Sequence, residues 1–307
     1  MPKIAFIFPG QGSQYVGMAR DFFDSAPEAR EMIARADTLL GIPLSRICFD
    51  GPEEELRQTR NTQPAIFLHS VVAARHVTSW KADMVAGHSL GEYSALVAAQ
   101  AITFEDALRL VRLRGELMQR AGERQKGTMA AVVGLTPDAV EAICTEAAAA
   151  GIVQPANFNS PGQIVISGSV EGVRKAMELA KLGGAKLVKE LIVSGAFHSP
   201  LMESAREGLK EALDRTTIRN ASIPVYANVT AEPVTAAAEI RELLFRQLTT
   251  PVRWEQTVRN MVRDGATRFV EIGPGKVLQG LAKRTEAGVQ TAGVDKFADI
   301  ATLETVR

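Results

Sequence analysis

The stretch Gly87-His88-Ser89-Leu90-Gly91 decides how the rest of the chain is interpreted, because a serine stands here between two glycines. A short apolar run precedes it, and residues 92–99 have the composition of a helix. A strand, a sharp turn at a serine and a helix together form the nucleophile-elbow pattern. The glycines leave room for a turn so tight that flanking side chains would collide. The pattern predicts that the Ser89 hydroxyl stands above the strand ends, with the Leu90 backbone N–H available to an oxyanion.

The composition of the 307-residue chain is that of an ordinary globular protein, with room for one large or two smaller domains. Lysine plus arginine equals aspartate plus glutamate at 35 each, so we expect neither a nucleic-acid partner nor a membrane partner. Cys48 and Cys144 are too few and too far apart to suggest a disulfide scaffold or a metal cluster. No apolar run at the N-terminus is long enough for a signal peptide or a membrane span. We therefore expect a cytoplasmic protein without a metal or cofactor.

The first apolar run, residues 3–8, is typical of a buried parallel strand and ends at the loop Pro9-Gly10-Gln11-Gly12-Ser13-Gln14. This loop has neither the glycine spacing of dinucleotide-binding folds nor the Lys-Ser/Thr ending of a phosphate loop. Loops at the ends of parallel strands nevertheless suit a binding site, so Gln11 is a candidate site residue.

Proline and glycine mark the ends of the first helices. Pro27 is expected to open a helix that Gly41 closes, and Pro64 to open a second one. His69 and His76 fall within that second helix. Because no partner signature accompanies them, we interpret both as surface or core histidines.

A further predicted helix runs from Phe104 to about Ala121, is capped by Thr103, and carries an arginine in the middle of its apolar face. The apolar residues on that face are Ala107, Leu110, Val111, Leu117, Met118 and Ala121. An unpaired guanidinium inside a protein is costly, so Arg114 must find an anion or reach solvent. The partner is either an internal carboxylate in a structural ion pair or the carboxylate of a substrate, gripped by two guanidinium nitrogens.

The pattern of elements changes after about residue 126. Strands are predicted over residues 128–134, 152–158, 163–167 and 186–193, and helices over residues 137–150 and 169–182. This β-α-β-β-α-β order is that of a ferredoxin-like α+β subdomain. Parallel-strand signals resume later, at residues 223–226, 268–272 and 290–294. We therefore predict an α/β fold in which a large domain with a mostly parallel sheet, residues 1–126 and 195–307, is interrupted by a small subdomain, residues 127–194.

A loop histidine follows the predicted insert, in Gly195-Ala196-Phe197-His198-Ser199. His198 stands between a strand and a helix, where catalytic residues are often held, and is the best candidate for the general base of Ser89. His88 is the rival, although its position within the elbow directs its ring away from the serine hydroxyl. The alternative, that His198 is an ordinary loop residue, stays open on these grounds.

Motifs along nearly the whole chain resemble, in the same order, those of the malonyl-CoA:acyl carrier protein transacylases. They lie at residues 8–14, 62–65, 87–94, 112–115, 157–163, 195–199, 247–248, 251–254 and 271–275. The resemblance implies a hydrolase-like α/β catalytic domain with a ferredoxin-like insert and a cleft between the two. It further implies malonyl transfer from coenzyme A to the phosphopantetheine thiol of acyl carrier protein, through a malonyl-serine, in fatty-acid synthesis. Malonyl-CoA and acyl carrier protein are then the expected partners, and a monomer is the expected state.

The resemblance also implies roles for single residues. The nucleophile falls on Ser89, the catalytic histidine on His198 and the carboxylate-binding arginine on Arg114. The oxyanion hole falls on the backbone N–H groups of Gln11 and Leu90.

Further residues are expected around the same cleft. A backbone carbonyl at Gln247 is expected to orient the histidine, which gives a Ser-His dyad with no acid. Gln63, Met118 and Asn159 are expected to contact substrate, and Phe197 could crowd an α-methyl branch. Three alternatives remain open: a trans-acting polyketide acyltransferase, a serine esterase or thioesterase, and a non-catalytic binding protein.

Overall fold

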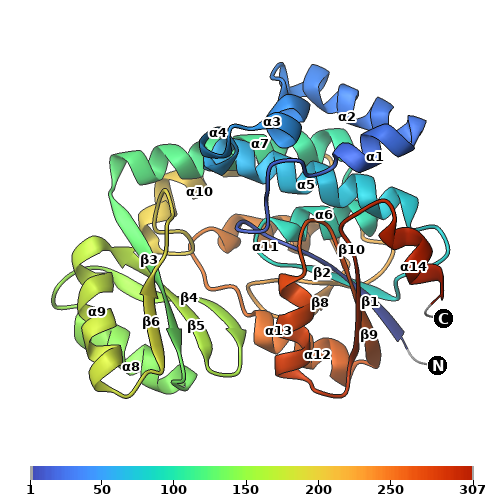
Figure 1. Cartoon of the computed structure of the whole chain (residues 1–307). Coiled ribbons are helices and arrows are strands. Elements are labelled where there is room, and N and C mark those ends of the chain that lie inside the picture. Colours follow the sequence, from blue (N-terminus) through green and yellow to red (C-terminus); the bar gives the residue numbers. More distant parts are fainter. Residues whose placement is uncertain (1–2, 306–307) are drawn as a thin grey trace.

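Two β-sheets with different strand directions form the framework of the protein (Figure 1). The computed structural model describes residues 3–305. The first sheet has the strand order β10-β9-β1-β2-β7-β8, and its neighbouring strands are parallel except for β7 and β8. The strands are β1 (Lys3–Phe8), β2 (Met84–Gly87), β7 (Val225–Tyr226), β8 (Pro233–Val234), β9 (Ala266–Ile272) and β10 (Gln290–Val294). The predicted mostly parallel sheet is confirmed, with the short edge strand β8 as an addition that the sequence analysis missed.

Alternating side chains of β1 enter two separate cores on the two faces of this sheet. Ala5 and Ile7 pack in a cluster with residues of α12 (Trp254–Arg263) and α13 (Val277–Thr285). Phe6 and Phe8 belong to the larger cluster formed with the helices from the first half of the chain. The strand is therefore buried on both faces, as a continuous apolar run predicts.

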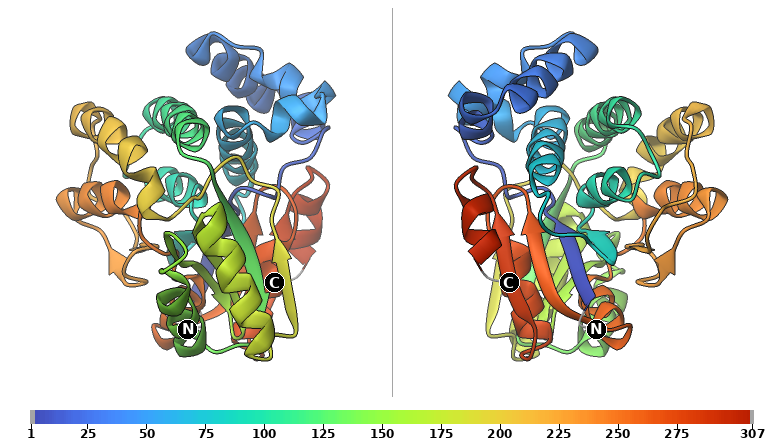
Figure 2. Two further views of the ribbon diagram at one scale, coloured as in Figure 1. Left: turned by 90° about the vertical axis from the view of Figure 1, so that its left-hand side faces the viewer. Right: turned by 90° about the vertical axis from the view of Figure 1, so that its right-hand side faces the viewer.

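The remaining helices of the large region cover the other face of the parallel sheet and extend beyond it, with α1 and α2 far from the sheet (Figures 1 and 2). They are α1 (Arg20–Ser25), α2 (Pro27–Leu40), α3 (Leu44–Asp50), α4 (Glu53–Arg57), α5 (Thr59–His76), α6 (Gly91–Ala98), α7 (Phe104–Arg124), α10 (Glu203–Arg215), α11 (Ala237–Gln247) and α14 (Asp299–Thr305). The helix over residues 27–40 and the Thr103 cap of α7, whose hydroxyl accepts the Asp106 N–H, were predicted correctly. None of the helices within residues 3–305 is long and apolar enough to cross a membrane.

The prediction that Pro64 opens a helix was wrong, because α5 begins five residues earlier, at Thr59. A proline inside a helix has no N–H to donate to the carbonyl four residues before it. That carbonyl, of Arg60, instead accepts a hydrogen bond from Nη1 of Arg112 at 2.9 Å. The proline is thus accommodated because the neighbouring helix α7 satisfies the freed carbonyl.

The second sheet has the order β4-β5-β3-β6 with antiparallel neighbours. Its elements are β3 (Gly127–Val133), α8 (Pro137–Ala147), β4 (Val153–Ser160), β5 (Gln163–Ser169), α9 (Val170–Leu182) and β6 (Leu187–Glu190). One face packs against α8 and α9 through Val132, Ile164 and Ile166. The predicted order of elements and the ferredoxin-like α+β class are confirmed. The exact limits of the subdomain, residues 127–194, stay a prediction.

Candidate active site

The elbow at Ser89 is a strained turn that only glycines can flank. Ser89 has a φ of 51°, in the left-handed region that side chains rarely adopt. A Cβ at Gly87 would lie 1.9 Å from the carbonyl carbon of Gly91, and one at Gly91 would lie 2.1 Å from the Phe8 carbonyl oxygen. The steric reason inferred for both glycines is therefore visible in the backbone.

Ser89 and His198 lie in hydrogen-bond contact, although 109 residues separate them. Oγ of Ser89 is 2.8 Å from Nε2 of His198, and Nδ1 of the same ring is 2.9 Å from the backbone oxygen of Gln247. Gln247 ends α11, so this carbonyl has no partner within its own helix. Because a carbonyl oxygen only accepts, Nδ1 carries the proton, and Nε2 is free to accept the proton of the serine.

Burial and the positive charge of Arg114 lower the pKa of His198 to about 3, so the ring is neutral at pH 7. His198 itself has a φ of 56°, a second strained residue at this point. Its backbone oxygen accepts a hydrogen bond from Nε2 of Gln154 on β4 at 2.8 Å. The strained loop is therefore fixed by a side chain of the second sheet.

Arg114 is fully buried and is held by neutral oxygens. Nη1 donates to Oε1 of Gln63 at 2.7 Å, and Nη2 donates to Oε1 of Gln247 at 2.9 Å and to Oγ of Ser89 at 3.1 Å. Within residues 3–305 no carboxylate lies at ion-pair distance, so the internal ion pair considered for this residue is not formed. Burial lowers the pKa of the guanidinium, and Tyr93 and Glu92 act against that shift. The positive charge beside the nucleophile is left without a direct counter-ion.

One predicted oxyanion donor, Leu90, follows the nucleophile directly in sequence, and the other, Gln11, comes from the loop after β1. Leu90 immediately precedes α6, at the positive end of the helix dipole, and Gln11 lines the same cavity as Ser89. The N–H of Ser89 itself donates to Oδ1 of Asn228 at 2.6 Å and is thus engaged. Any oxyanion beside Ser89 has to be bound by other N–H groups, and the assignment of this role to Gln11 and Leu90 stays a prediction.

A cavity of about 310 Å³ opens between the two sheets at Ser89 and His198. Gln63, Met118, Asn159 and Phe197 line it, together with apolar side chains of the second sheet and of α13. Nε2 of His88 is 2.8 Å from Oδ1 of Asn159, so this ring turns away from the serine hydroxyl, as predicted. All the polar residues expected at the site therefore meet at one cavity, either in its wall or directly behind it.

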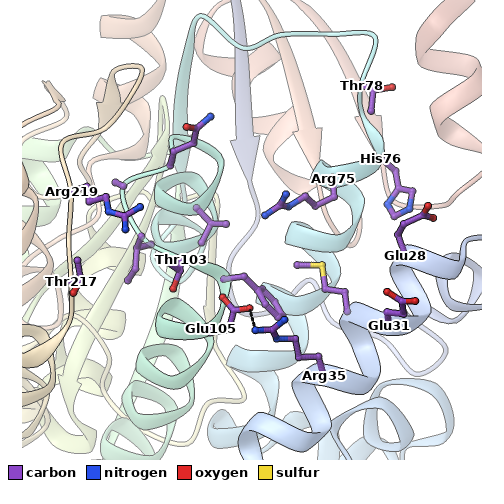
Figure 3. A pocket seen from close by; sticks show the side chains of 16 residues that line it. Glu28, Glu31, Arg35, Arg75, His76, Thr78, Thr103, Glu105, Thr217 and Arg219 are labelled. Atoms are coloured by element: carbon purple, nitrogen blue, oxygen red, sulfur yellow. Dashed lines mark ion pairs between the residues drawn. The ribbon is translucent and has the colours of Figure 1, made fainter.

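A larger cavity, of about 960 Å³, lies elsewhere on the molecule, among α2, α5 and α7 (Figure 3). Its charged side chains include Arg35 and Glu105, which pair with each other at 2.7 Å. None of the predicted site residues lines it. By volume alone this cavity would be the candidate active site. The smaller cavity is the better candidate, because the buried polar side chains converge on it.

Sequence reasoning missed three residues that hold the site together: Glu92, Gln154 and Asn228. Glu92 is buried on the elbow helix, and Asn228 contacts the elbow backbone. Gln154 reaches the site from β4. A carboxylate in the first turn of an otherwise apolar helix was a usable signal for Glu92. No local pattern marks the other two.

Comparisons with known proteins agree with this geometry. Residues 5–301 match the family described as "Acyl transferase domain". The malonyl CoA-acyl carrier protein transacylase of Bacillus subtilis is 46% identical over 297 residues, 96% of this chain and 94% of the relative. The solved transacylase of Coxiella burnetii superimposes with a TM-score of 0.95 at 39% identity, covering 99% and 97% of the two chains.

A further solved structure is that of a malonyl-transacylase in complex with a type II polyketide synthase acyl-carrier protein. It has a TM-score of 0.96 and 41% identity, and covers 99% of this chain and 100% of that one. The chain therefore belongs to the acyl transferase domain family, among the malonyl-CoA:acyl carrier protein transacylases.

Proposed function

We propose that this protein is an [acyl-carrier-protein] S-malonyltransferase, which moves a malonyl group from coenzyme A to the phosphopantetheine thiol of acyl carrier protein. The observation that carries the proposal is the meeting of Ser89, His198 and Arg114. The serine hydroxyl contacts both the unprotonated nitrogen of a neutral imidazole and a buried guanidinium. A nucleophile with its base suits acyl transfer, and a cation without a carboxylate partner suits an acyl group that ends in a carboxylate.

In the first half-reaction the Ser89 hydroxyl attacks the thioester carbonyl of malonyl-CoA while Nε2 of His198 takes its proton. The backbone N–H groups of Gln11 and Leu90 stabilise the tetrahedral oxyanion, each by about 3 kcal/mol in comparable sites. The carbon–sulfur bond then breaks, and the proton on His198 passes to the departing coenzyme A sulfur. A malonyl ester of Ser89 remains.

In the second half-reaction the phosphopantetheine thiol of the carrier gives its proton to His198 and attacks the ester carbonyl. The new carbon–sulfur bond forms, the bond to Ser89 breaks, and the proton returns to Oγ. The backbone carbonyl of Gln247 keeps Nδ1 protonated in both directions, so no carboxylate is needed to fix the tautomer.

Arg114 binds the free carboxylate of the malonyl group. A buried guanidinium held only by amide and hydroxyl oxygens can exchange a neutral acceptor for a charged one, and charge-assisted hydrogen bonds are roughly twice as strong as neutral ones. This exchange favours malonyl over acetyl groups. Phe197 in the cavity wall adds a steric limit on an α-methyl branch, worth about 1–3 kcal/mol.

Intact-mass measurement after brief mixing with malonyl-CoA tests the proposal. We expect one malonyl adduct on the protein and none on Ser89→Ala, followed by loss of the adduct when acyl carrier protein is added. An esterase or thioesterase would instead release malonate to water faster than it loads a carrier. A protein that only binds its ligand would show no adduct.

The carrier is proposed to be that of fatty-acid synthesis. Because one solved relative is described in complex with a type II polyketide synthase carrier, loading rates on both kinds of carrier should be compared. We also propose that the enzyme acts as a monomer in the cytoplasm, since every residue used above comes from one chain and the donor is a coenzyme A thioester. Sedimentation and cell fractionation test these two points.

A further inference from the structure

A buried carboxyl group, not used in the mechanism above, lies directly behind the nucleophile. Glu92 is in the first turn of α6 and only 3% exposed. Its Oε2 accepts two hydrogen bonds, from the backbone N–H of Asn228 at 3.0 Å and from Nε2 of Gln247 at 2.9 Å. Within the described residues Glu92 forms no ion pair, and burying a carboxyl group without one is costly. A role in the active site would explain why the Glu92 carboxyl group is buried there.

The bond from Gln247 to Glu92 fixes which way round the glutamine amide lies. Nε2 of Gln247 donates to Glu92 and to the backbone oxygen of Ser89 at 3.0 Å, which leaves Oε1 facing Nη2 of Arg114 at 2.9 Å. In the flipped amide, Oε1 would face two acceptor oxygens, and the NH₂ group would face a guanidinium that only donates. Glu92 and the Ser89 carbonyl together therefore keep Oε1 of Gln247 directed at Arg114.

The same carboxyl group supports the elbow through Asn228. Oδ1 of Asn228 accepts the N–H of Ser89 at 2.6 Å, and Nδ2 donates to the Gly87 carbonyl oxygen at 2.7 Å. The asparagine backbone N–H donates to Glu92. One carboxyl group thus connects the strained serine, the glutamine whose carbonyl orients His198, and the arginine beside the nucleophile.

We propose that Glu92 is a positioning residue for malonyl transfer, and that it takes up a proton when the acyl carboxylate pairs with Arg114. This inference rests on the proposed function. The charged and titratable groups that face Glu92 are Arg114 from α7 and Tyr93 from its own helix. The segment around Asn228 and the end of α11 present neutral amides. Glu92 is the carboxyl group that acts, together with Tyr93, against the burial-driven lowering of the pKa of Arg114.

The coupling follows from charge. Burial raises the pKa of Glu92 to about 7, against the lowering effect of its two hydrogen-bond donors and of Arg114. A substrate carboxylate on Arg114 offsets the positive charge that lowers the pKa of Glu92. Its binding therefore raises that pKa further and shifts Glu92 toward its neutral form. An acetyl group brings no charge and leaves Glu92 unchanged.

The direct test is calorimetric binding to Ser89→Ala, which cannot react, in buffers of different ionisation enthalpy at pH 7. We expect a fractional net proton uptake with malonyl-CoA that exceeds the uptake with acetyl-CoA, and no such excess in the double variant Ser89→Ala, Glu92→Gln. Acetyl-CoA corrects for the phosphates of the shared coenzyme. Equal proton uptake for the two thioesters would overturn the proposal, and this comparison needs no substitution at position 92.

Kinetics give the second test. Glu92→Leu removes the oxygen that accepts from Gln247 and from the Asn228 N–H, so kcat/KM for malonyl transfer should fall by about 10- to 100-fold. Acetyl transfer should fall less, and Glu92→Gln, which keeps an acceptor oxygen, should recover part of the loss. The matched control is Glu271→Leu. Glu271 is another fully buried carboxyl group, with raised pKa, which accepts the N–H groups of Leu278 and Gln279. Substitution of Glu271 should lower the free energy of unfolding without changing the ratio of malonyl transfer to acetyl transfer.

The two proposals fail in different ways. If the unmodified protein does not form a malonyl-serine, the proposed function is wrong. If it does, and Glu92→Leu keeps the same malonyl-to-acetyl ratio and pH profile, then only the role of Glu92 is wrong.

Discussion

The two sheets contribute different kinds of residue to the cavity that lies between them. The parallel sheet and its helices provide the half-buried nucleophile Ser89 and the buried polar groups of His198 and Arg114. The antiparallel sheet provides mainly wall residues, such as Met129 and Val165. The two regions also differ in which residues have a strained backbone. Ser89 and His198 have positive φ values, whereas all positive-φ residues between 127 and 194 are glycines. Two of the five non-glycine residues with positive φ in the described chain are thus the proposed nucleophile and its base, and none of the five lies in the antiparallel region.

This contrast suggests that the parallel region determines whether the reaction occurs and the antiparallel region determines how well a substrate fits. Substitutions in the first should then act on chemistry by orders of magnitude, and substitutions in the second by small factors.

The largest expected effect is that of Ser89→Ala. Removing the nucleophile should lower malonyl transfer by at least about 10⁴-fold while the thermal unfolding curve stays close to that of the unmodified protein. Ser94→Ala is the matched control, because Ser94 is buried on α6, the helix that follows the elbow, and its hydroxyl has no hydrogen-bond partner within the described residues. Steady-state transfer assays on the two variants should therefore differ sharply. Equal activities would remove Ser89 from the mechanism.

A pair of glycine substitutions compares the turns of the two regions. Gly87→Ala would place a Cβ 1.9 Å from a backbone carbon, so we expect a loss of about 3 kcal/mol or more in the free energy of unfolding. Gly162 has a φ of 68°, but a Cβ there meets nothing closer than 3.7 Å. Gly162→Ala should cost only about 1 kcal/mol, from the left-handed backbone alone. Urea denaturation of both variants measures the difference, and similar losses would contradict it.

Arg114→Ala should separate the two acyl groups. Loss of a bidentate charged contact should lower kcat/KM for malonyl transfer by about 10²-fold, while acetyl transfer changes by only a few fold. Arg109→Ala provides the control, because Arg109 lies on the exposed side of the same helix with only a long ion pair to Asp106. If malonyl and acetyl transfer fell equally in Arg114→Ala, the guanidinium would not be the carboxylate site.

The depressed pKa of His198, about 3, predicts a stability change with pH. The unfolded histidine titrates near pH 6.5, so below that pH the unfolded chain binds a proton that the folded chain does not. The free energy of unfolding should fall by about 1.4 kcal/mol for each pH unit below 6.5 from this group alone. Burial lowers the pKa of His69 and His88 too, so both add to the slope. Urea titrations at pH 7, 6 and 5 should therefore show a smaller slope for His198→Gln than for the unmodified protein. Identical slopes would mean that the ring is not buried in its neutral form.

The smallest expected effect comes from the antiparallel region. Asn159→Ala removes one hydrogen bond to His88 at the cavity wall, so kcat/KM should fall by about fivefold, or roughly 1 kcal/mol. The extent of Ser89 labelling should not change. Arg174→Ala, on the opposite side of that sheet, should leave both quantities unchanged. A fall in kcat/KM of several orders of magnitude in Asn159→Ala would contradict the proposal that the antiparallel region affects only substrate fit.

The sequence was informative where a local pattern has one physical explanation. The glycines around Ser89 and the arginine on the apolar face of α7 are such patterns, because steric exclusion and the cost of a buried charge leave few alternatives. The order of elements between residues 127 and 190 was equally readable from its periodicity.

Contacts made across the fold could not be predicted in this way. Asn228 meets the elbow from a segment 139 residues away, and its own neighbours carry no periodic signal. The start of α5 was misplaced because the carbonyl that Pro64 leaves free is satisfied by Arg112 from another helix. In each case the deciding partner becomes adjacent only after the chain has folded.

The attachment of β4 to the parallel region limits how the insert can be exchanged between relatives. Phe158 and Val252 form a backbone hydrogen bond of 2.9 Å, Val252 returns one to Ala156 at 2.8 Å, and Gln154 holds the His198 loop. A chimera that replaced only residues 127–194 would put a foreign strand against an unmatched segment 249–252. A graft intended to change acyl preference should therefore take residues 127–194 and residues 249–252 from the same donor. If only the insert is exchanged, we expect the His198 ring to lose its alignment with Ser89.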